Sequence, residues 1–191
     1  VEVGKTKEGG KGFYRNKYAL QGGFKFFDLF TENLVLQIEY NQAQPFTYAH
    51  KVPEQNWAHY NQPLAHPLGA NFREVIGIAN YRWKRFYGQA KMQIATFGEE
   101  EDGFHTGRNI FISDFDINNF PDSYGNEINQ GNKTNLLNAE LRLGYLLNPK
   151  INMNLELLFA ARKLSNDDTE ETMKYFSFSF KTDLFNHYYD F

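Results

Sequence analysis

The sequence has no cysteine, no strong excess of either charge and no long apolar run, and each absence narrows the class of protein. Without cysteine there can be no disulfide, no zinc–thiolate site and no thiol nucleophile. The formal net charge is -3 at pH 7, and the sequence has no basic stripe, so nucleic acid is not expected as a partner. No stretch of about 18 apolar residues occurs, which excludes a transmembrane helix.

Aromatic residues, in contrast, are abundant. They make up 17% of the 191 residues and include 19 Phe and 12 Tyr. This content is high for a soluble domain and suits both strands and an aromatic girdle at a membrane interface. The low mean hydropathy of -0.61 does not conflict with membrane strands, because such strands place apolar residues only at every second position.

Alternation of apolar and polar residues predicts seven β-strands, each about long enough to cross a bilayer at a tilt. The clearest example is near the end of the chain, where Phe176, Phe178 and Phe180 alternate with Ser177 and Ser179. The predicted strands cover residues 18–27, 33–41, 73–83, 86–97, 136–147, 151–163 and 173–185.

The polar sides of these strands carry charges of both signs. Burial in a soluble core would leave several of these charges unpaired, whereas a hydrated barrel interior can pair or solvate them. We therefore expect ion pairs inside a barrel among Glu140, Arg142, Glu156 and Arg162. The alternative is a soluble antiparallel sandwich or a lipocalin-like barrel, whose apolar faces would point inward.

The connections between the predicted strands alternate in length. Tight turns are expected near residues 29–32, 84–85 and 148–150, and long loops at 41–72 and 98–135. Short periplasmic turns and long extracellular loops are typical of bacterial outer-membrane barrels. The sequence therefore predicts an all-β, antiparallel transmembrane β-barrel in outer-membrane lipid, with extracellular long loops and a periplasmic C-terminus.

Seven strands are an odd number, whereas single-chain bacterial barrels have an even number. The chain also begins at Val1 without an export signal, although an outer-membrane protein must be exported. We therefore expect residues 1–191 to be the C-terminal part of one longer barrel domain. Phe191, preceded by Tyr189, resembles the C-terminal signal that barrel-insertion machinery recognises.

The loop at 41–72 is rich in histidine, aromatic residues and amides. Its histidines are nine and seven residues apart, which matches no standard metal-ligand spacing. Aromatic rings can stack on the apolar faces of sugars while amides and imidazoles bond the hydroxyls, so the loop is interpreted as a glycan-binding surface. The alternative is a folded loop that caps or constricts the barrel. The candidate ligand-binding residues are Tyr48, His50, Trp57, His59, Tyr60, Gln62 and His66.

In the second long loop, Asp114, Asp116 and Asn118 have the one-three-five spacing of a calcium loop. The pattern then fails, because Asn119 stands where glycine is needed and Gly125 where the bidentate glutamate should be. A solvated acidic loop is the favoured interpretation. No cofactor is expected.

No nucleophile elbow, phosphate loop or paired catalytic constellation is present in the sequence. The charged residues on the strands are better explained as barrel ion pairs than as catalysts. A non-enzymatic function is therefore predicted.

Two runs in the first loop, EYNQAQPFTYAH at 39–50 and HYNQPLAHPLGAN at 59–71, resemble the signature of the Wzi-like capsule-assembly family of Gram-negative bacteria. In Bacteroidota this family includes proteins associated with gliding motility and the cell surface. The resemblance extends from GGFKFFDLF at 22–30 to DLFNHYYDF at 183–191.

The resemblance implies an outer-membrane barrel of about eighteen strands, within the size range of such barrels, of which this chain covers roughly the C-terminal third. It also implies a lectin-like protein that organises surface exopolysaccharide, with other surface proteins of a gliding or secretion complex as partners. A porin-like or translocation-associated channel is the alternative function.

Overall fold

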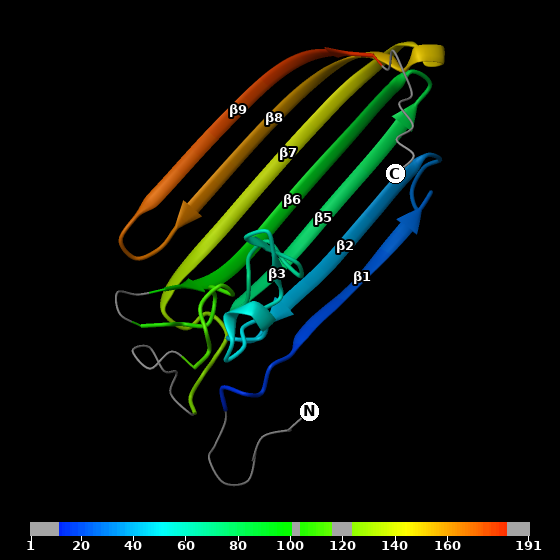
Figure 1. Ribbon diagram of the computed structural model, residues 1–191. Helices are drawn as coiled ribbons and strands as arrows, with labels where there is room; N and C mark the ends of the chain where they lie inside the picture. Colours follow the sequence, from blue (N-terminus) through cyan, green and yellow to red (C-terminus); the bar gives the residue numbers. More distant parts are fainter. Residues whose placement is uncertain (1–11, 101–103, 116–123, 183–191) are drawn as a thin grey trace.

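The computed structural model describes residues 12–100, 104–115 and 124–182. Seven long strands form one antiparallel sheet, in which each strand pairs with the next long strand along the chain (Figure 1). They are β1 (Ala19–Phe27), β2 (Leu34–Ala43), β5 (Phe72–Trp83), β6 (Phe86–Glu99), β7 (Asn132–Asn148), β8 (Met153–Ser165) and β9 (Glu170–Lys181).

The remaining regular structure is small. Strands β3 (Ala58–His59) and β4 (Gln62–Pro63) form a short hairpin, and η1 (Pro53–Gln55) and η2 (Pro149–Ile151) are single 3-10 turns. The described part of the chain contains no helix long and apolar enough to cross a membrane.

The all-β, antiparallel prediction is confirmed, and all seven predicted strands are present with shifted ends. Strand β7 begins at Asn132 rather than at 136, because its polar first residues still pair with the end of β6. Strand β8 begins at Met153 rather than at 151, because η2 and the left-handed Asn152 (φ 45°) form the preceding turn. Residues 183–185 of the last predicted strand, and Phe191, lie outside the described residues.

The predicted tight turns are present. Asp28 and Lys84 take left-handed φ values of 55° and 54° in the first two turns, and the Asn148 side chain accepts a hydrogen bond from the backbone N–H of Lys150 in the third. A fourth short turn joins β8 to β9, where Asn166 Oδ1 accepts hydrogen bonds from the N–H and hydroxyl of Thr169. Asparagine and aspartate suit these turns because their side chains bond nearby backbone groups.

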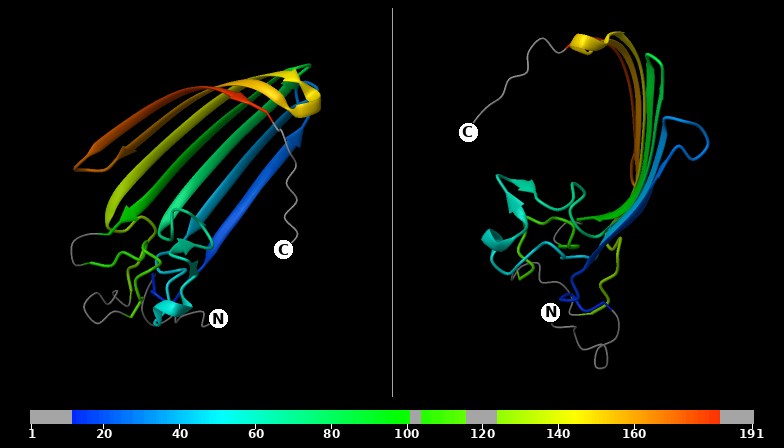
Figure 2. Two further views of the ribbon diagram at one scale, coloured as in Figure 1. Left: turned by 45° about the horizontal axis from the view of Figure 1, so that its top comes forward. Right: turned by 90° about the vertical axis from the view of Figure 1, so that its right-hand side faces the viewer.

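The sheet is curved, and the two long loops fold over its concave side at one end (Figure 2). His66 of the first loop lies 3.0 Å from the carboxylate of Glu74, which identifies the polar face of the sheet as the concave one. Cross-strand partners such as Lys91 with Glu140 and Gln89 with Arg142 share that face. The predicted division of each strand into a polar and an apolar side is therefore confirmed.

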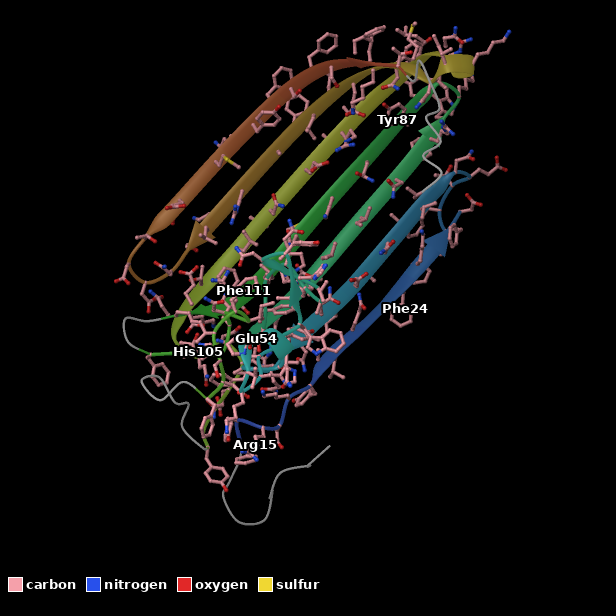
Figure 3. All side chains as sticks on the ribbon, in the orientation of Figure 1. Arg15, Phe24, Glu54, Tyr87, His105 and Phe111 are labelled. Atoms are coloured by element: carbon pink, nitrogen blue, oxygen red, sulfur yellow. The ribbon has the colours of Figure 1, made fainter. Side chains whose placement is uncertain are left out.

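The middle and the turn end of the convex face are apolar and lack a covering layer among the described residues, whereas its loop end also carries polar residues such as Arg73, Lys163 and Lys174. One row across β5, β6 and β7 consists of Val75, Ile94 and Leu137, which are 40%, 48% and 39% exposed. Phe24 on β1, labelled in Figure 3, lies on the same face, because the register places it level with Ile38 and Gly77, and it is 69% exposed. Other exposed members are Phe26, Ile38, Met92, Leu141, Leu143, Phe159, Phe176, Phe178 and Phe180.

The buried core lies instead where the sheet meets the long loops. It contains Ala43, Ala70, Phe72, Ala95, Phe97 and Leu136. Within the described residues the outer edges of β1 and β9 are unpaired, so the sheet is open and does not close into a barrel. In the described part of the chain the fold is therefore a curved sheet whose packed core lies where the long loops contact it.

Candidate functional site

The two long loops are joined through Asn71, which is fully buried at the start of β5. Its side-chain N–H groups donate to the carbonyl oxygens of Gly98 (3.2 Å) and Gln130 (2.9 Å), and its Oδ1 accepts from the N–H of Asn129 (2.7 Å). Gly98 is required by the close approach, because a Cβ there would lie 1.7 Å from the Gln130 oxygen. One asparagine therefore satisfies backbone groups at both ends of the second loop.

Asn56 likewise joins the two loops, here through backbone groups in the middle of each. Its amide donates to the carbonyl of Ile110 at 2.7 Å, and its Oδ1 accepts from the N–H of His50 at 2.6 Å. The His50 carbonyl in turn accepts from the N–H of Asp114. The two loops therefore form one folded unit.

Glu100 organises the beginning of the second loop. Its carboxylate accepts hydrogen bonds from the backbone N–H groups of Thr106 and Asn109 and lies 3.1 Å from Nδ1 of His105. Burial alone would raise the pKa of Glu100, but the hydrogen bond and charge of His105 and the two backbone donors outweigh it and hold the pKa below its ordinary value.

The β3–β4 hairpin carries the most exposed predicted ligand-binding residues. Its turn uses left-handed φ values at Tyr60 (47°) and Asn61 (57°), as a tight two-residue hairpin turn requires. Trp57 is held by backbone hydrogen bonds to Tyr48 and Leu64, yet its side chain is 56% exposed. Tyr60 is 89% exposed, and its ring lies 4.3 Å from that of His59.

The predicted residues therefore fall into two groups. Trp57, His59, Tyr60 and Gln62 lie together on the hairpin. Tyr48 and His66 lie where the loop meets the sheet, and His50 lies in the middle of the loop. Tyr48 packs against the core, where burial raises the pKa of its hydroxyl, and His50 makes backbone contacts with Asn56 and Asp114.

His66 connects the first loop to the concave face of the sheet. Its ring stacks on Phe72 at 4.2 Å between centroids, and its Nε2 lies 3.0 Å from Oε2 of Glu74. Glu74 is 2% exposed and also accepts hydrogen bonds from the amides of Asn41 (2.9 Å) and Gln93 (2.5 Å). The sequence pattern places Glu74 on a polar side, but nothing in it indicates that His66 reaches this carboxylate.

A second polar cluster lies on the same face near the tight turns. The Tyr87 hydroxyl, labelled in Figure 3, lies 2.9 Å from Asn154 Oδ1 and 3.1 Å from Glu156 Oε2. Glu156 also pairs with Lys181 and Arg142.

The predicted ion pairs are thus partly confirmed. Arg142 pairs with Glu140 at 2.9 Å and with Glu156 at 3.7 Å. Arg162 forms no ion pair within the described ranges, whereas Lys181 forms an ion pair with Glu156. Lys181 follows Ser177 and Ser179 on the polar side of β9, and the strand register places it opposite Asn154 of β8, near Glu156.

The calcium candidates are only partly described. Asp116 and Asn118 lie outside the described residues, and the carboxylate of Asp114 pairs with Lys17. The same Lys17 ammonium donates to the carbonyl of Ala49 at 2.6 Å. Across residues 12–100, 104–115 and 124–182 there is no group of three or more His, Asp or Glu side chains that could hold a metal.

Comparisons of the chain with protein-family models, with curated proteins and with solved structures found no significant match. The arrangement of the residues is therefore the basis for the function proposed below.

Proposed function

We propose that this chain forms part of an outer-membrane β-barrel whose extracellular loops bind surface polysaccharide. The observation that carries the binding function is the β3–β4 hairpin, where Trp57 and Tyr60 are exposed on a backbone fixed by hydrogen bonds. Exposed flat rings on a rigid support suit stacking against sugar rings, because little side-chain entropy is lost on binding.

The hairpin also supplies groups for the sugar hydroxyls. His59 lies beside Tyr60, and Gln62 occupies the opposite strand of the hairpin, paired with His59. An imidazole and an amide both donate and accept hydrogen bonds, which matches hydroxyl groups of either orientation. The combination of rings and these side chains favours a polysaccharide over an apolar ligand.

The membrane placement is supported by the uncovered convex face. Soluble monomers rarely expose a contiguous apolar patch larger than a few hundred Å², yet apolar rows cross all seven long strands here. Exposure of each large apolar side chain to water costs about 1.5 to 3 kcal/mol relative to burial. Lipid chains would remove this cost without any further protein layer.

The turn end of the convex face carries a row of aromatic rings. Trp83 stacks with Phe86 at 6.0 Å between centroids, and Phe86 contacts Tyr145 at 4.7 Å. Aromatic residues of this kind gather at the interface between lipid and water. The row supports placement of the tight turns at one membrane surface and of the long loops beyond the other.

The unpaired edges of β1 and β9 support additional strands. Edge N–H and C=O groups in lipid would be left without water, so membrane sheets close on themselves. Neither edge strand contains proline, one of the features that block further pairing. We therefore propose that the sheet is one wall of a larger barrel of about eighteen strands, within the range seen for such barrels.

A conducting channel is the competing function. A polar concave face would suit it, but the first loop lies over that face and is tied to it through His66 and Glu74. We therefore favour binding over conduction. Single-channel recording of the full-length protein separates the two, since a binding protein with a closed lumen gives no discrete conductance steps.

The binding function is tested with the double variant Trp57→Ala, Tyr60→Ala in cells that make surface polysaccharide. The expected result is loss of retained polysaccharide with an unchanged amount of protein in the outer-membrane fraction. Phe111→Ala is the matched control, because Phe111 is an exposed aromatic residue (41%) of the second loop, outside the hairpin. Equal retention by wild type and the double variant would refute the proposal for this hairpin.

A further inference from the structure

A polar pocket of about 560 Å³ lies at the loop end of the sheet, away from the hairpin. Its walls are formed by the segment before β1, by the two residues that follow β2 in the sequence and by the end of the second loop. Its lining combines aromatic rings with amides and one guanidinium: Phe13, Tyr14, Tyr18, Gln44, Arg73 and Asn126.

The walls of this pocket are fixed. The Gly12 carbonyl accepts hydrogen bonds from the backbone and side-chain N–H groups of Asn126, both at 3.0 Å. Gly12 has φ 82°, and a Cβ there would lie 2.5 Å from the Asn126 nitrogen, so glycine is needed for the contact. On the other side, the Gln44 amide donates to the Tyr18 hydroxyl at 2.7 Å.

The pocket opens on the convex side of the sheet. Arg73 is in register with Gln42 and Thr96, and this polar row lies next to the apolar row that contains Val75 and Ile94. The Asn129 amide donates to the Thr96 hydroxyl at 3.0 Å, which places the end of the second loop on the same side. The pocket therefore adjoins the loop end of the face that we propose to be in lipid.

Arg73 supplies an available positive charge in this pocket. The residue is exposed, and its guanidinium forms no ion pair with any carboxylate in the described part of the chain. Glu127 also lines the pocket without an ion-pair partner among those residues. A guanidinium binds an oxyanion through two parallel N–H groups, whereas a carboxylate accepts from sugar hydroxyls.

A separate apolar groove of about 1070 Å³ lies nearer the middle of the convex face, where it crosses the strands from β1 to β9. Gly77 lies in it, four residues beyond Arg73 on the same face of β5, or about 13 Å at roughly 3.3 Å per residue. Phe26 and Phe30 line one side and Phe159 and Phe176 the other. Arg73 of the pocket and Gly77 of the groove thus lie on one face of β5, with Val75 between them.

We propose that the pocket binds the anionic sugar headgroup of a glycolipid whose acyl chains lie in the groove. This inference depends on the proposed membrane placement and is independent of the hairpin. Arg73 binds the anionic group, Tyr18 and Phe13 contact the sugar rings, and Gln44 and Glu127 bond the hydroxyls. A soluble glycan would leave the groove without a role, and a phospholipid without sugar would not use the rings and amides.

The test uses the full-length protein in nanodiscs that contain equal amounts of a phosphorylated glucosamine-based glycolipid and phosphatidylglycerol. Insertion into nanodiscs without glycolipid reports the membrane placement separately. The wild type is expected to retain the glycolipid in preference to phosphatidylglycerol after extraction, as measured by native mass spectrometry. Arg73→Gln should reduce glycolipid occupancy at least about tenfold, the size of one lost charge-assisted contact. Tyr18→Ala should reduce it by about tenfold through the loss of ring stacking.

Two variants control for charge and for the groove. Arg82→Gln removes an exposed arginine from the other end of β5 and should leave occupancy unchanged. Gly77→Leu should fill the groove, since a Cβ at Gly77 meets no atom within 4 Å, and it should reduce binding of the glycolipid but not of its free phosphorylated headgroup.

Several outcomes would overturn the proposal. Equal retention of the two lipids, or equal losses for Arg73→Gln and Arg82→Gln, would mean that the pocket does not select a glycolipid. Binding of the free headgroup as tight as that of the glycolipid would identify the site as one for soluble glycans. If Trp57→Ala still reduces polysaccharide binding in those cases, the proposed hairpin function stands and only this inference fails.

Discussion

The side-chain amide of Asn71 and the carbonyl oxygen of Gln130 lie 2.9 Å apart although 59 residues separate them in sequence. Asn71 also takes a left-handed backbone conformation, with φ 56°. Replacement by alanine removes three hydrogen bonds, leaves buried backbone groups unpaired and adds the penalty for alanine in a left-handed conformation, which asparagine tolerates better. We expect Asn71→Ala to lower the free energy of unfolding by about 2 to 4 kcal/mol and to expose both loops to protease.

Asn61 provides the control for backbone strain. It has nearly the same φ, 57°, but is exposed in the hairpin turn. Asn61→Ala should therefore cost only the left-handed penalty of about 1 to 2 kcal/mol. Thermal unfolding in detergent and limited proteolysis measure both variants. Equal losses would show that the buried hydrogen bonds of Asn71 contribute little.

Phe178 and Ser177 are adjacent on β9 and face opposite sides of the sheet. Phe178 is 62% exposed on the convex side, and Ser177 lies on the concave side. In a lipid-facing position, Phe178→Arg should destabilise the protein by about 2 to 4 kcal/mol, whereas Ser177→Arg should cost much less. Unfolding in lipid vesicles measures the difference. If the convex face were in water, Phe178→Arg would be neutral and would increase solubility, which would contradict the membrane placement.

The sequence was sufficient to predict the sheet because its strands have a regular period of two. Lys181 illustrates this, since alternation alone put it on the polar side where it meets Glu156. The short turns were predictable for a related reason, because Asn148 acts on the N–H only two residues away. In both cases the information is local.

The loops were not predictable because their contacts are distant in sequence. Asn71 and Asn56 bond backbone groups 59 and 54 residues away, and Glu100 bonds backbone groups six and nine residues further along its own loop. No local pattern distinguishes these three residues from solvated polar ones. His66 shows a related limit, since nothing in the sequence indicates that its imidazole contacts the carboxylate of Glu74. The exposure of Trp57 and Tyr60 likewise depends on how the loop folds.

Glu100 should make the second loop sensitive to acid. Its pKa is lowered in the folded protein from an ordinary value of 4.5. The hydrogen-bonded carboxylate therefore stabilises the loop fully above pH 4.5, and this contribution is lost as the pH falls through the lowered pKa. Proteolysis of the loop should therefore increase as the pH is lowered from 5 to the lowest pH at which the protease is active.

The variant Glu100→Gln tests the assignment of this acid sensitivity. It should loosen the loop already at neutral pH, because an amide cannot replace the charge that accepts from Thr106 and Asn109. Its cleavage should then change less with pH than that of the wild type. An unchanged pH profile would assign the acid sensitivity to another carboxylate.

Trp57 and Tyr60 allow binding to be separated from stability. Both side chains are largely exposed, 56% and 89%, so truncation removes little packing. If sugars stack on them, Trp57→Ala and Tyr60→Ala should each weaken polysaccharide binding by about 1 to 3 kcal/mol, by analogy with stacking of bases on aromatic rings, with thermal stability near that of the wild type.

If the hairpin instead packs as a cap against other parts of the barrel, Trp57→Ala would destabilise the protein by several kcal/mol. Thermal stability in detergent and polysaccharide binding on cells, measured on the same variants, decide between the two. Loss of stability with intact binding would remove the hairpin as a glycan-binding surface, because the rings would then act through packing rather than through contact with sugar.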